Sequence, residues 1–126
     1  MPYGCTFKTY PDYLRVEVSG GWTPGKEGED SVRVWGEVAE TCKKEGKTRI
    51  LAIWDVAGRL PPMDGYNLGA NPERFGWDRR FKLATVHLHE ERFQDGLFVE
   101  TVALNRGFRV KMFEDEEKAK SWLLAS

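Results

Sequence analysis

An unbroken apolar run in the middle of the chain, residues 50–54, constrains the fold more than any other feature. A strand with one wet face alternates apolar and polar residues, whereas a strand buried on both faces reads as a continuous apolar run. This run is far too short to span a bilayer. We therefore expect a central strand over Arg49–Val56 that is covered on both sides.

The residues before this strand predict a β-hairpin. Residues 6–10 have the pattern of a strand, and residues 14–19 alternate apolar and charged side chains with the period of two that is typical of a half-exposed strand. The edge of this hairpin, together with Trp22, offers a surface on which two copies of the chain can pair. The sequence neither requires nor excludes such a homodimer.

A helix is expected between the hairpin and the central strand. Residues 20–28 are rich in glycine and predict a loop, after which apolar residues recur at helical spacing as far as about residue 44. The sequence leaves two starts open for this helix. Either Thr23 caps it with Pro24 at the first position, or Asp30 or Ser31 is the cap.

The second half of the chain alternates helices and strands. We expect a short helix over 63–70, a buried strand over 81–88, a helix ending near residue 105, a strand over 108–113 and a last helix over 115–124. The order is β-β-α-β-α-β-α-β-α. Since right-handed crossovers make the later strands mostly parallel, the expected fold class is α/β: a mixed, mostly parallel five-stranded sheet with an N-terminal hairpin and about four helices, forming one domain over residues 1–126.

Composition narrows the classes of function. The formal net charge is -1, so the basic excess that duplex nucleic acid selects is absent overall. Cys5 and Cys42 are too few for a disulfide framework, and the N-terminus lacks the pattern of a signal peptide. We expect a cytoplasmic protein with no transmembrane segment and no duplex nucleic-acid partner.

Three segments carry a resemblance to a known family, and the third is the most specific. They are Leu14-Arg15-Val16-Glu17-Val18-Ser19-Gly20, the central strand ending in Asp55-Val56-Ala57-Gly58-Arg59, and the stretch from Phe98-Val99-Glu100 through Asn105-Arg106-Gly107 to Lys118-Ala119. Together they resemble the STAS domain, the fold of bacterial anti-sigma-factor antagonists, and most closely its SpoIIAA-like branch, also called STAS/SEC14. The resemblance implies a STAS-like fold.

The same resemblance implies that the family's regulatory switch is missing. In regulatory STAS proteins an Asp-Ser-Ser-Gly-type motif carries a serine that accepts a phosphate. The matching stretch here, residues 63–69, resembles it at Asp64 and Gly69 but has Gly65 at the place of the phosphoserine, and no Ser or Thr occurs over residues 49–84. A serine switch at this site is excluded, and with it the reason to expect a sigma-factor pathway partner.

Candidate binding residues follow the central strand. Asp55, Arg59 and Asp64 come after its carboxyl end, where ligands of open α/β sheets usually enter. A helix starting near Met63 would help to hold an anion there. The alternative is that the two aspartates cap turns and Arg59 is solvated.

A second candidate surface combines aromatic and basic residues. Phe75, Trp77 and Phe81 alternate with Arg74, Arg79, Arg80 and Lys82, a pattern that fits lipid headgroups, an acidic partner or single-stranded nucleic acid. The favoured alternative is that the rings close the core while the cations stay in water.

Metal and catalytic motifs are weak. His87 and His89 would face the same side of a strand and, with a neighbouring glutamate, could hold zinc, but no further His exists in the chain. We favour histidines that face solvent or anchor a loop, and we expect no metal and no cofactor. Cys42 is predicted to be buried and inert, and no nucleophile-elbow, phosphate-loop or dinucleotide motif is present, so no catalytic residue is assigned.

Two functions follow from these observations. The first is a non-enzymatic regulatory or protein-interaction domain that uses residues 55–69 and the neighbouring helices to bind a partner protein. The alternative is a carrier of a small hydrophobic or lipid-like ligand. Its pocket would lie between the second and third helices and the sheet, lined by Tyr66, Leu68, Phe75, Trp77 and Phe98.

Overall fold

The computed structural model describes residues 3–23, 25–56 and 60–125. It confirms the expected α/β order. The elements are β1 (Tyr3–Thr9), β2 (Leu14–Gly20), α1 (Glu27–Glu45), β3 (Arg49–Val56), α2 (Pro62–Ala70), the short 3-10 helix η1 (Pro72–Phe75), β4 (Lys82–His87), α3 (Glu90–Asn105), β5 (Arg109–Phe113) and α4 (Glu116–Leu124).

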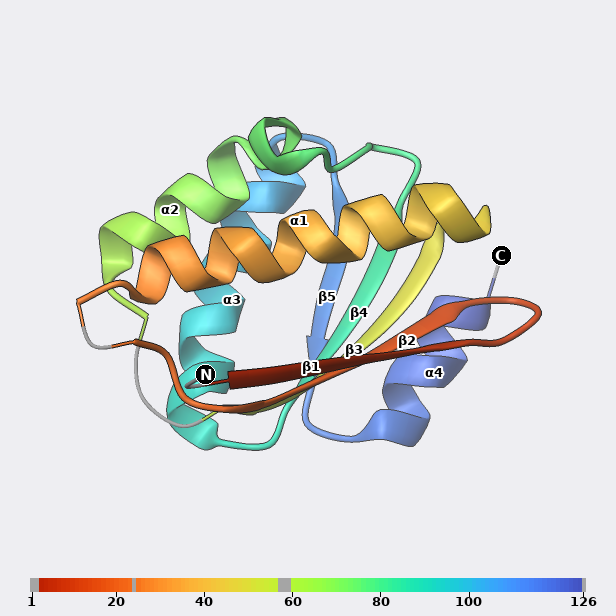
Figure 1. Cartoon of the computed structure of the whole chain (residues 1–126), viewed down its shortest axis with the longest axis horizontal. Coiled ribbons are helices and arrows are strands. Elements are labelled where there is room, and N and C mark those ends of the chain that lie inside the picture. The colour runs from red at the N-terminus through yellow and green to blue at the C-terminus, as the bar shows by residue number, and fades with distance from the viewer. Residues whose placement is uncertain (1–2, 24, 57–59, 126) are drawn as a thin grey trace.

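The five strands form one sheet in the order β1-β2-β3-β4-β5. β1 is antiparallel to β2, and every later pairing is parallel. Because each crossover advances in the same direction, right-handed connections place α1, α2 and α3 on one face. The chain passes to the other face only after β5, so α4 lies on the side of the sheet opposite α1 (Figure 1).

Burial of the central strand on both faces is confirmed. Residues 50–54 are at most 4% exposed. Trp54 packs in the cluster beneath α1, which contributes Val34 and Val38. Leu51 and Ile53 face the other way and pack in the cluster with Ala119 and Leu123 of α4. Each fully buried side chain of this size contributes about 1.5–3 kcal/mol, so the apolar run explains why the sheet is covered twice.

The back face of the sheet is covered only in part. On β2, Arg15 and Glu17 lie in register with Leu51 and Ile53, on the same side as α4. The guanidinium of Arg15 donates to both carboxylate oxygens of Glu116, at 3.1 and 3.2 Å, and to Glu17 at 2.9 Å. These hydrogen bonds from Arg15 connect the first turn of α4 to β2.

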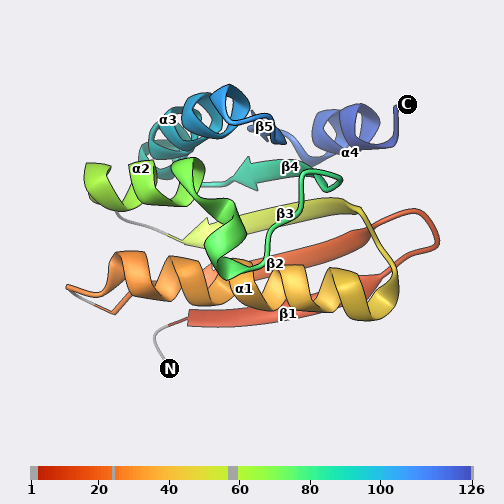
Figure 2. The same cartoon turned by 90° about the horizontal axis from the view of Figure 1, so that it is seen from above.

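α2 packs mainly on its neighbouring helices. Figure 2 shows it beside α3, above the carboxyl-terminal half of the sheet. A side chain on Gly69 would place its Cβ 2.8 Å from Val102 Cβ and 2.9 Å from the carbonyl oxygen of Val99. Glycine at this position therefore permits the close approach of α2 to α3.

Two element starts in the sequence interpretation are wrong. β1 begins at Tyr3, not at residue 6, because it pairs with β2 along its whole length. Neither proposed cap starts α1: the helix begins at Glu27, and Asp30 lies inside it, where its carboxylate accepts the backbone N–H of Thr23 at 2.7 Å. Pro24 lies outside the described residues.

Trp22 is also not at the hairpin edge. Its side chain is 9% exposed, and its ring lies 5.5 Å from that of Tyr3 and 5.9 Å from that of Trp54. The core on the α1 side of the sheet takes up this ring, so it offers no surface for pairing two copies. A homodimer formed through the hairpin, which the sequence left open, would have to use the edge of β1 without Trp22.

Candidate functional site

The carboxyl ends of β2, β3 and β4 and the N-termini of α1, α2 and α3 meet along one edge of the sheet, which we call the carboxyl edge. Asp55, near the end of β3, and His89, just before α3, are brought together here: Asp55 Oδ1 lies 2.8 Å from His89 Nε2. The two side chains are 54% and 36% exposed. A contact so open to water contributes about 0–1 kcal/mol, so it holds β3 and the start of α3 together only weakly.

Asp64 lies elsewhere on this edge. It belongs to the first turn of α2, and its carboxylate packs against Gly28 of α1. There it helps to line a groove of about 480 Å³ between α1 and α2, together with Arg33, Arg74 and Phe75. The third residue of the predicted trio, Arg59, lies outside the described residues. The structure therefore assigns Asp55 and Asp64 to different surroundings.

The charges of the carboxyl edge do not favour an anionic ligand. Acidic side chains occupy the first turns of all three helices that begin here: Glu27, Glu29 and Asp30 in α1, Asp64 in α2, Glu90 and Glu91 in α3. A helix N-terminus attracts anions through its partial positive charge. Carboxylates already occupy those positions and would repel a further negative charge.

The predicted internal pocket exists, but it is small. An apolar pocket of about 50 Å³ lies between α2, α3 and the sheet. Leu68, Phe75 and Trp77 line it as expected, with Trp35, Val99 and Phe108. Tyr66 and Phe98 do not line it: they are 40% and 45% exposed, because both side chains project from the outer surface of the α2–α3 pair. The predicted lining is wrong for these two residues.

A second small pocket, with a few polar groups in its lining, was missed by the sequence interpretation. It measures about 30 Å³, enough for a water molecule, and its lining includes Ser31, Trp54 and His87. Ser31 Oγ and Trp54 Nε1 are buried there and have no hydrogen-bond partner among the described residues. No signal in the sequence marked them, since Ser31 fits the helical pattern of α1 and Trp54 fits the apolar run.

The favoured alternative holds for the aromatic and basic segment before β4 except at Lys82, which is buried rather than solvated. Trp77 and Phe81 are 6% and 3% exposed, and Phe75 is partly buried against the same core. Trp77 lies 5.4 Å from Trp35 and 5.1 Å from Phe81, ring centre to ring centre. The arginines of this segment, Arg74, Arg79 and Arg80, are exposed. No aromatic platform for a lipid or a nucleobase forms here among the described residues.

The two histidines do not share a face. β4 ends at His87, which is 7% exposed and stacks on Trp54, whereas His89 has left the strand and precedes α3. The expectation that both rings point to one side is wrong because the strand ends before His89. Among the described residues, no group of three or more His, Cys, Asp or Glu side chains has the geometry to hold a metal ion.

Neither thiol is poised for nucleophilic chemistry. Burial in the core raises the pKa of Cys42 to about 12. Burial, and to a lesser degree the negative charge of Glu37, raises the pKa of Cys5 to about 11. Since the thiolate is the reactive form, both side chains are unreactive near neutral pH.

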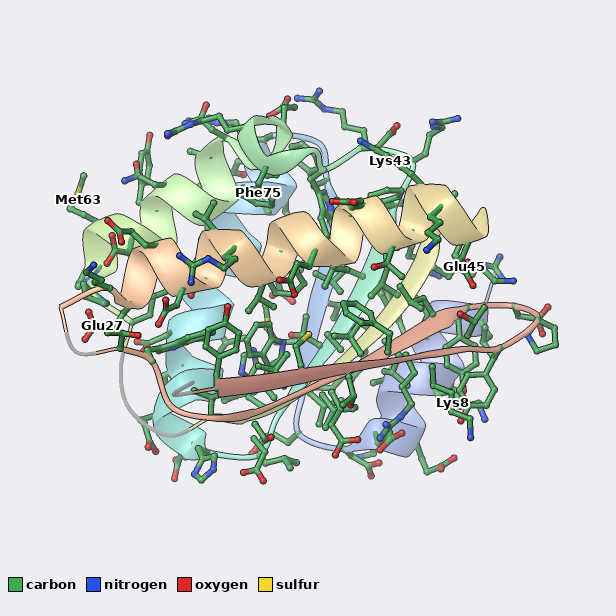
Figure 3. All side chains as sticks on the ribbon, in the orientation of Figure 1. Lys8, Glu27, Lys43, Glu45, Met63 and Phe75 are labelled. Atoms are coloured by element: carbon green, nitrogen blue, oxygen red, sulfur yellow. The ribbon has the colours of Figure 1, made fainter. Side chains whose placement is uncertain are left out.

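Apolar side chains are exposed on the outer surface of α2 and α3. Met63 and Tyr66 of α2 are 67% and 40% exposed, and Phe98 of α3 is 45% exposed. We call these three residues the α2–α3 face, and Figure 3 shows Met63 pointing away from the molecule. Phe98 also lines a groove of about 260 Å³ with Leu60, Pro62 and Gly65.

Gly65 of α2 lies beneath this face. It is buried, and a Cβ there would lie 3.4 Å from Val99 Cγ2 and 3.5 Å from Phe98 Cδ2. α2 therefore packs against α3 at this position.

No family model matches the chain, and no curated protein matches its sequence. None of the helices in the described part of the chain is long and apolar enough to cross a bilayer.

Proposed function

We propose that this chain is a non-enzymatic, STAS-like protein-interaction domain that binds a partner protein through its α2–α3 face. The observation that carries the proposal is the exposure of Phe98, which lines the 260 Å³ groove, together with the exposure of Met63 and Tyr66 on the neighbouring helix α2. Large apolar side chains gathered on one surface, next to a concave groove, are typical of protein-binding sites.

The lack of a phosphoacceptor fits constitutive binding. Gly65 has no hydroxyl, and it is buried where a Cβ would be in van der Waals contact with Val99 and Phe98 of α3. A partner recognised through Phe98 would be bound without a phosphorylation step on this helix. The non-enzymatic part of the proposal is supported by the raised pKa of both thiols, which keeps them protonated.

The alternative of a lipid-like carrier has less support. The pocket at the predicted place holds about 50 Å³, whereas small-molecule sites usually enclose about 300–1,000 Å³. A carrier would have to open α2 away from α3. The close contact at Gly69 opposes that movement.

We also propose that the protein acts in the cytoplasm. Cys5 and Cys42 are both free thiols in the structure. Free thiols persist in reducing compartments and are oxidised or paired in most secreted proteins.

The test is site-specific cross-linking from the proposed face. A benzophenone amino acid replaces Phe98 in one version of the chain and the exposed Glu17 of β2, on the other face of the sheet, in a control version. We expect one defined protein to be cross-linked from position 98 and not from position 17. That protein is then purified, and its binding to the unmodified chain is measured by calorimetry.

The variant Phe98→Glu should weaken this binding at least about tenfold, as expected for a central apolar contact, while leaving Tm unchanged because the side chain is exposed. Equal affinity of Phe98→Glu and the unmodified chain would contradict the proposal. A small molecule that co-purifies with the chain and is released only on unfolding would favour the carrier instead.

A further inference from the structure

Positively charged side chains gather where β3, β4 and β5 begin, at the edge of the sheet opposite the carboxyl edge. We call this group the amino-edge patch, and its members are Lys43, Arg49, Arg79, Arg80, Arg106 and Arg109. All are exposed except Arg49, which is partly buried. Figure 3 shows Lys43 near the C-terminal end of α1, close to the loop that follows η1.

Contacts between neighbours show that these cations form one surface. Arg109 Nη2 donates to the carbonyl oxygen of Arg80 at 2.7 Å, and Arg79 Nε donates to that of Arg106 at 3.0 Å. Lys43 Nζ would lie 3.4 Å from a Cβ on Gly76, in the turn just before Arg79. The patch therefore draws its charges from α1, β3, β5, the end of α3 and the loop before β4.

Arg49 and Arg109 are linked through β4. Both lie in register with Lys82, one on each side. The ammonium group of Lys82 is buried and donates to the carbonyl oxygens of Trp122 and Ala125, both at 2.8 Å. Burial, followed by the charges of Arg49 and then Arg109, lowers the pKa of Lys82 below its ordinary value, which is the effect expected of crowded positive charge.

Among the described residues, two acids form ion pairs with members of the patch. Glu73 pairs with Arg79 at 3.1 Å, and Asp78 pairs with Arg80 at 2.9 Å. Six cations and two acids leave an excess of four positive charges on this surface. Because the whole chain carries a formal net charge of -1, the rest of it carries an excess of five negative charges. The charge of this protein is thus distributed unevenly between the patch and the rest of the chain.

We propose that the amino-edge patch binds an acidic segment, rich in Asp or Glu, of a partner polypeptide. Guanidinium groups match carboxylates with two parallel hydrogen bonds. Arg80 already binds this way, since its Nε and Nη2 donate to the carboxylate of Asp78. Arg49, Arg106 and Arg109 have no carboxylate partner among the described residues, and they supply guanidinium groups for further carboxylates.

Nucleic acid fits the same surface less well. Single strands are held by stacking bases on exposed aromatic rings, and the rings under the patch, Trp77, Phe81 and Phe108, are all less than 7% exposed. Arg79 itself covers Phe108, with its guanidinium carbon 4.7 Å from the ring centre. A duplex or a long single strand would also meet the negative charge carried by the rest of the molecule.

This inference uses a patch that adjoins the α2–α3 face, since Arg106 Nη2 donates to the hydroxyl oxygen of Tyr66 at 3.4 Å, but it does not depend on the proposed function. Failure of either test leaves the other intact, because Phe98→Glu changes no residue of the patch and the variants below change no residue of the α2–α3 face.

The experiment measures binding of a fluorescent oligoglutamate peptide by anisotropy at low salt. In the test variant, Lys43→Glu is combined with Arg106→Glu. In the control variant, Lys8→Glu is combined with Lys118→Glu, two exposed lysines on β1 and α4. Both variants change the net charge by the same amount, so a difference between them reports on the place of the charge. Thermal melts check that both fold.

We expect the unmodified chain to bind the peptide, and the test variant to bind it about tenfold to thirtyfold more weakly, from two lost attractions and two new repulsions. The affinity of the control variant for the peptide should fall by less than about threefold.

Equal losses of affinity in both variants, or no binding by the unmodified chain, would overturn the proposal. Tighter binding of oligothymidylate than of oligoglutamate would replace it with a nucleic-acid site. Salt-sensitive self-association that the test variant abolishes would assign the patch to a second copy of the chain.

Discussion

The contact between α2 and α3 gives a sharp test of the packing that positions the α2–α3 face. In the variant Gly69→Ala, the new Cβ would lie 2.8 Å from Val102 Cβ and 2.9 Å from the carbonyl oxygen of Val99. The second of these atoms belongs to the backbone of α3 and cannot move unless the helix moves. Overpacking of this kind costs about 1–3 kcal/mol.

The same substitution also has a favourable effect. Alanine in a helix is more stable than glycine by about 0.5–1 kcal/mol, since glycine loses more backbone freedom on folding. Gly69 does not have a positive φ, so its backbone accepts alanine. The steric cost is the larger effect, and the expected result is a net destabilisation of about 0.5–2 kcal/mol.

Gly36 of α1 provides the matched control. A Cβ there would lie 3.8 Å from the carbonyl oxygen of Phe75 and 3.9 Å from its Cβ, which is ordinary van der Waals contact. Only the favourable effect remains, so Gly36→Ala should stabilise the fold by about 0.5–1 kcal/mol.

Thermal melts and urea titrations of the two variants measure the difference. For a domain of this size Tm changes by roughly 4 °C for each kcal/mol, so Gly69→Ala should lower Tm while Gly36→Ala raises it by about 2–4 °C. A rise in Tm for Gly69→Ala would refute the close approach of α2 to α3. It would also restore the possibility that α2 moves aside to admit a larger ligand.

Two further predictions concern titratable groups. Hydrogen bonds from the side chain and then the backbone of Arg80 lower the pKa of Asp78 from its ordinary value of 3.8 to about 2, so its ionised form stabilises the fold above pH 3.8 and this stabilisation is lost as the pH falls toward about 2. The Tm difference between the unmodified chain and Asp78→Asn should therefore shrink over that interval, and a difference that stays constant would contradict the assigned cause. Because burial raises the pKa of Cys42 to about 12 and that of Cys5 to about 11, both thiols should resist iodoacetamide at pH 8 and react fully in denaturant, as counted by mass spectrometry. Rapid alkylation of Cys42 in the native protein would show that α1 opens easily.

Much of the fold was predictable because the pattern of apolar and polar residues repeats along each helix and strand. The apolar run over residues 50–54 predicted a strand buried on both faces, and all five residues are buried in the structure. The alternation of apolar and charged residues over 14–19 likewise predicted a strand with one solvent-exposed face, and Arg15 and Glu17 of β2 lie on the more exposed side. The ends of elements were harder to place, because a cap or a turn depends on a few residues and on what packs against them.

The candidate site was only partly predictable. Trp77 was correctly favoured as a core residue, since an aromatic ring next to a buried strand has a large apolar surface to cover. The predicted orientation of Tyr66 and Phe98 was wrong. Both residues lie on helices that pack against a second helix as well as against the sheet. Helical spacing alone does not tell which of these two neighbours a side chain faces.

The sequence by itself determined the order of the elements, the buried central strand and the absence of a hydroxyl at Gly65, because each of these is a property of neighbouring residues. Tertiary structure alone decided the volumes of the pockets, the pairing of Asp55 with His89 and the assembly of the amino-edge patch. Those features join residues far apart in the chain. Strand register and helix packing fix the distances between them, and a periodic pattern in one segment carries no information about its distance from another.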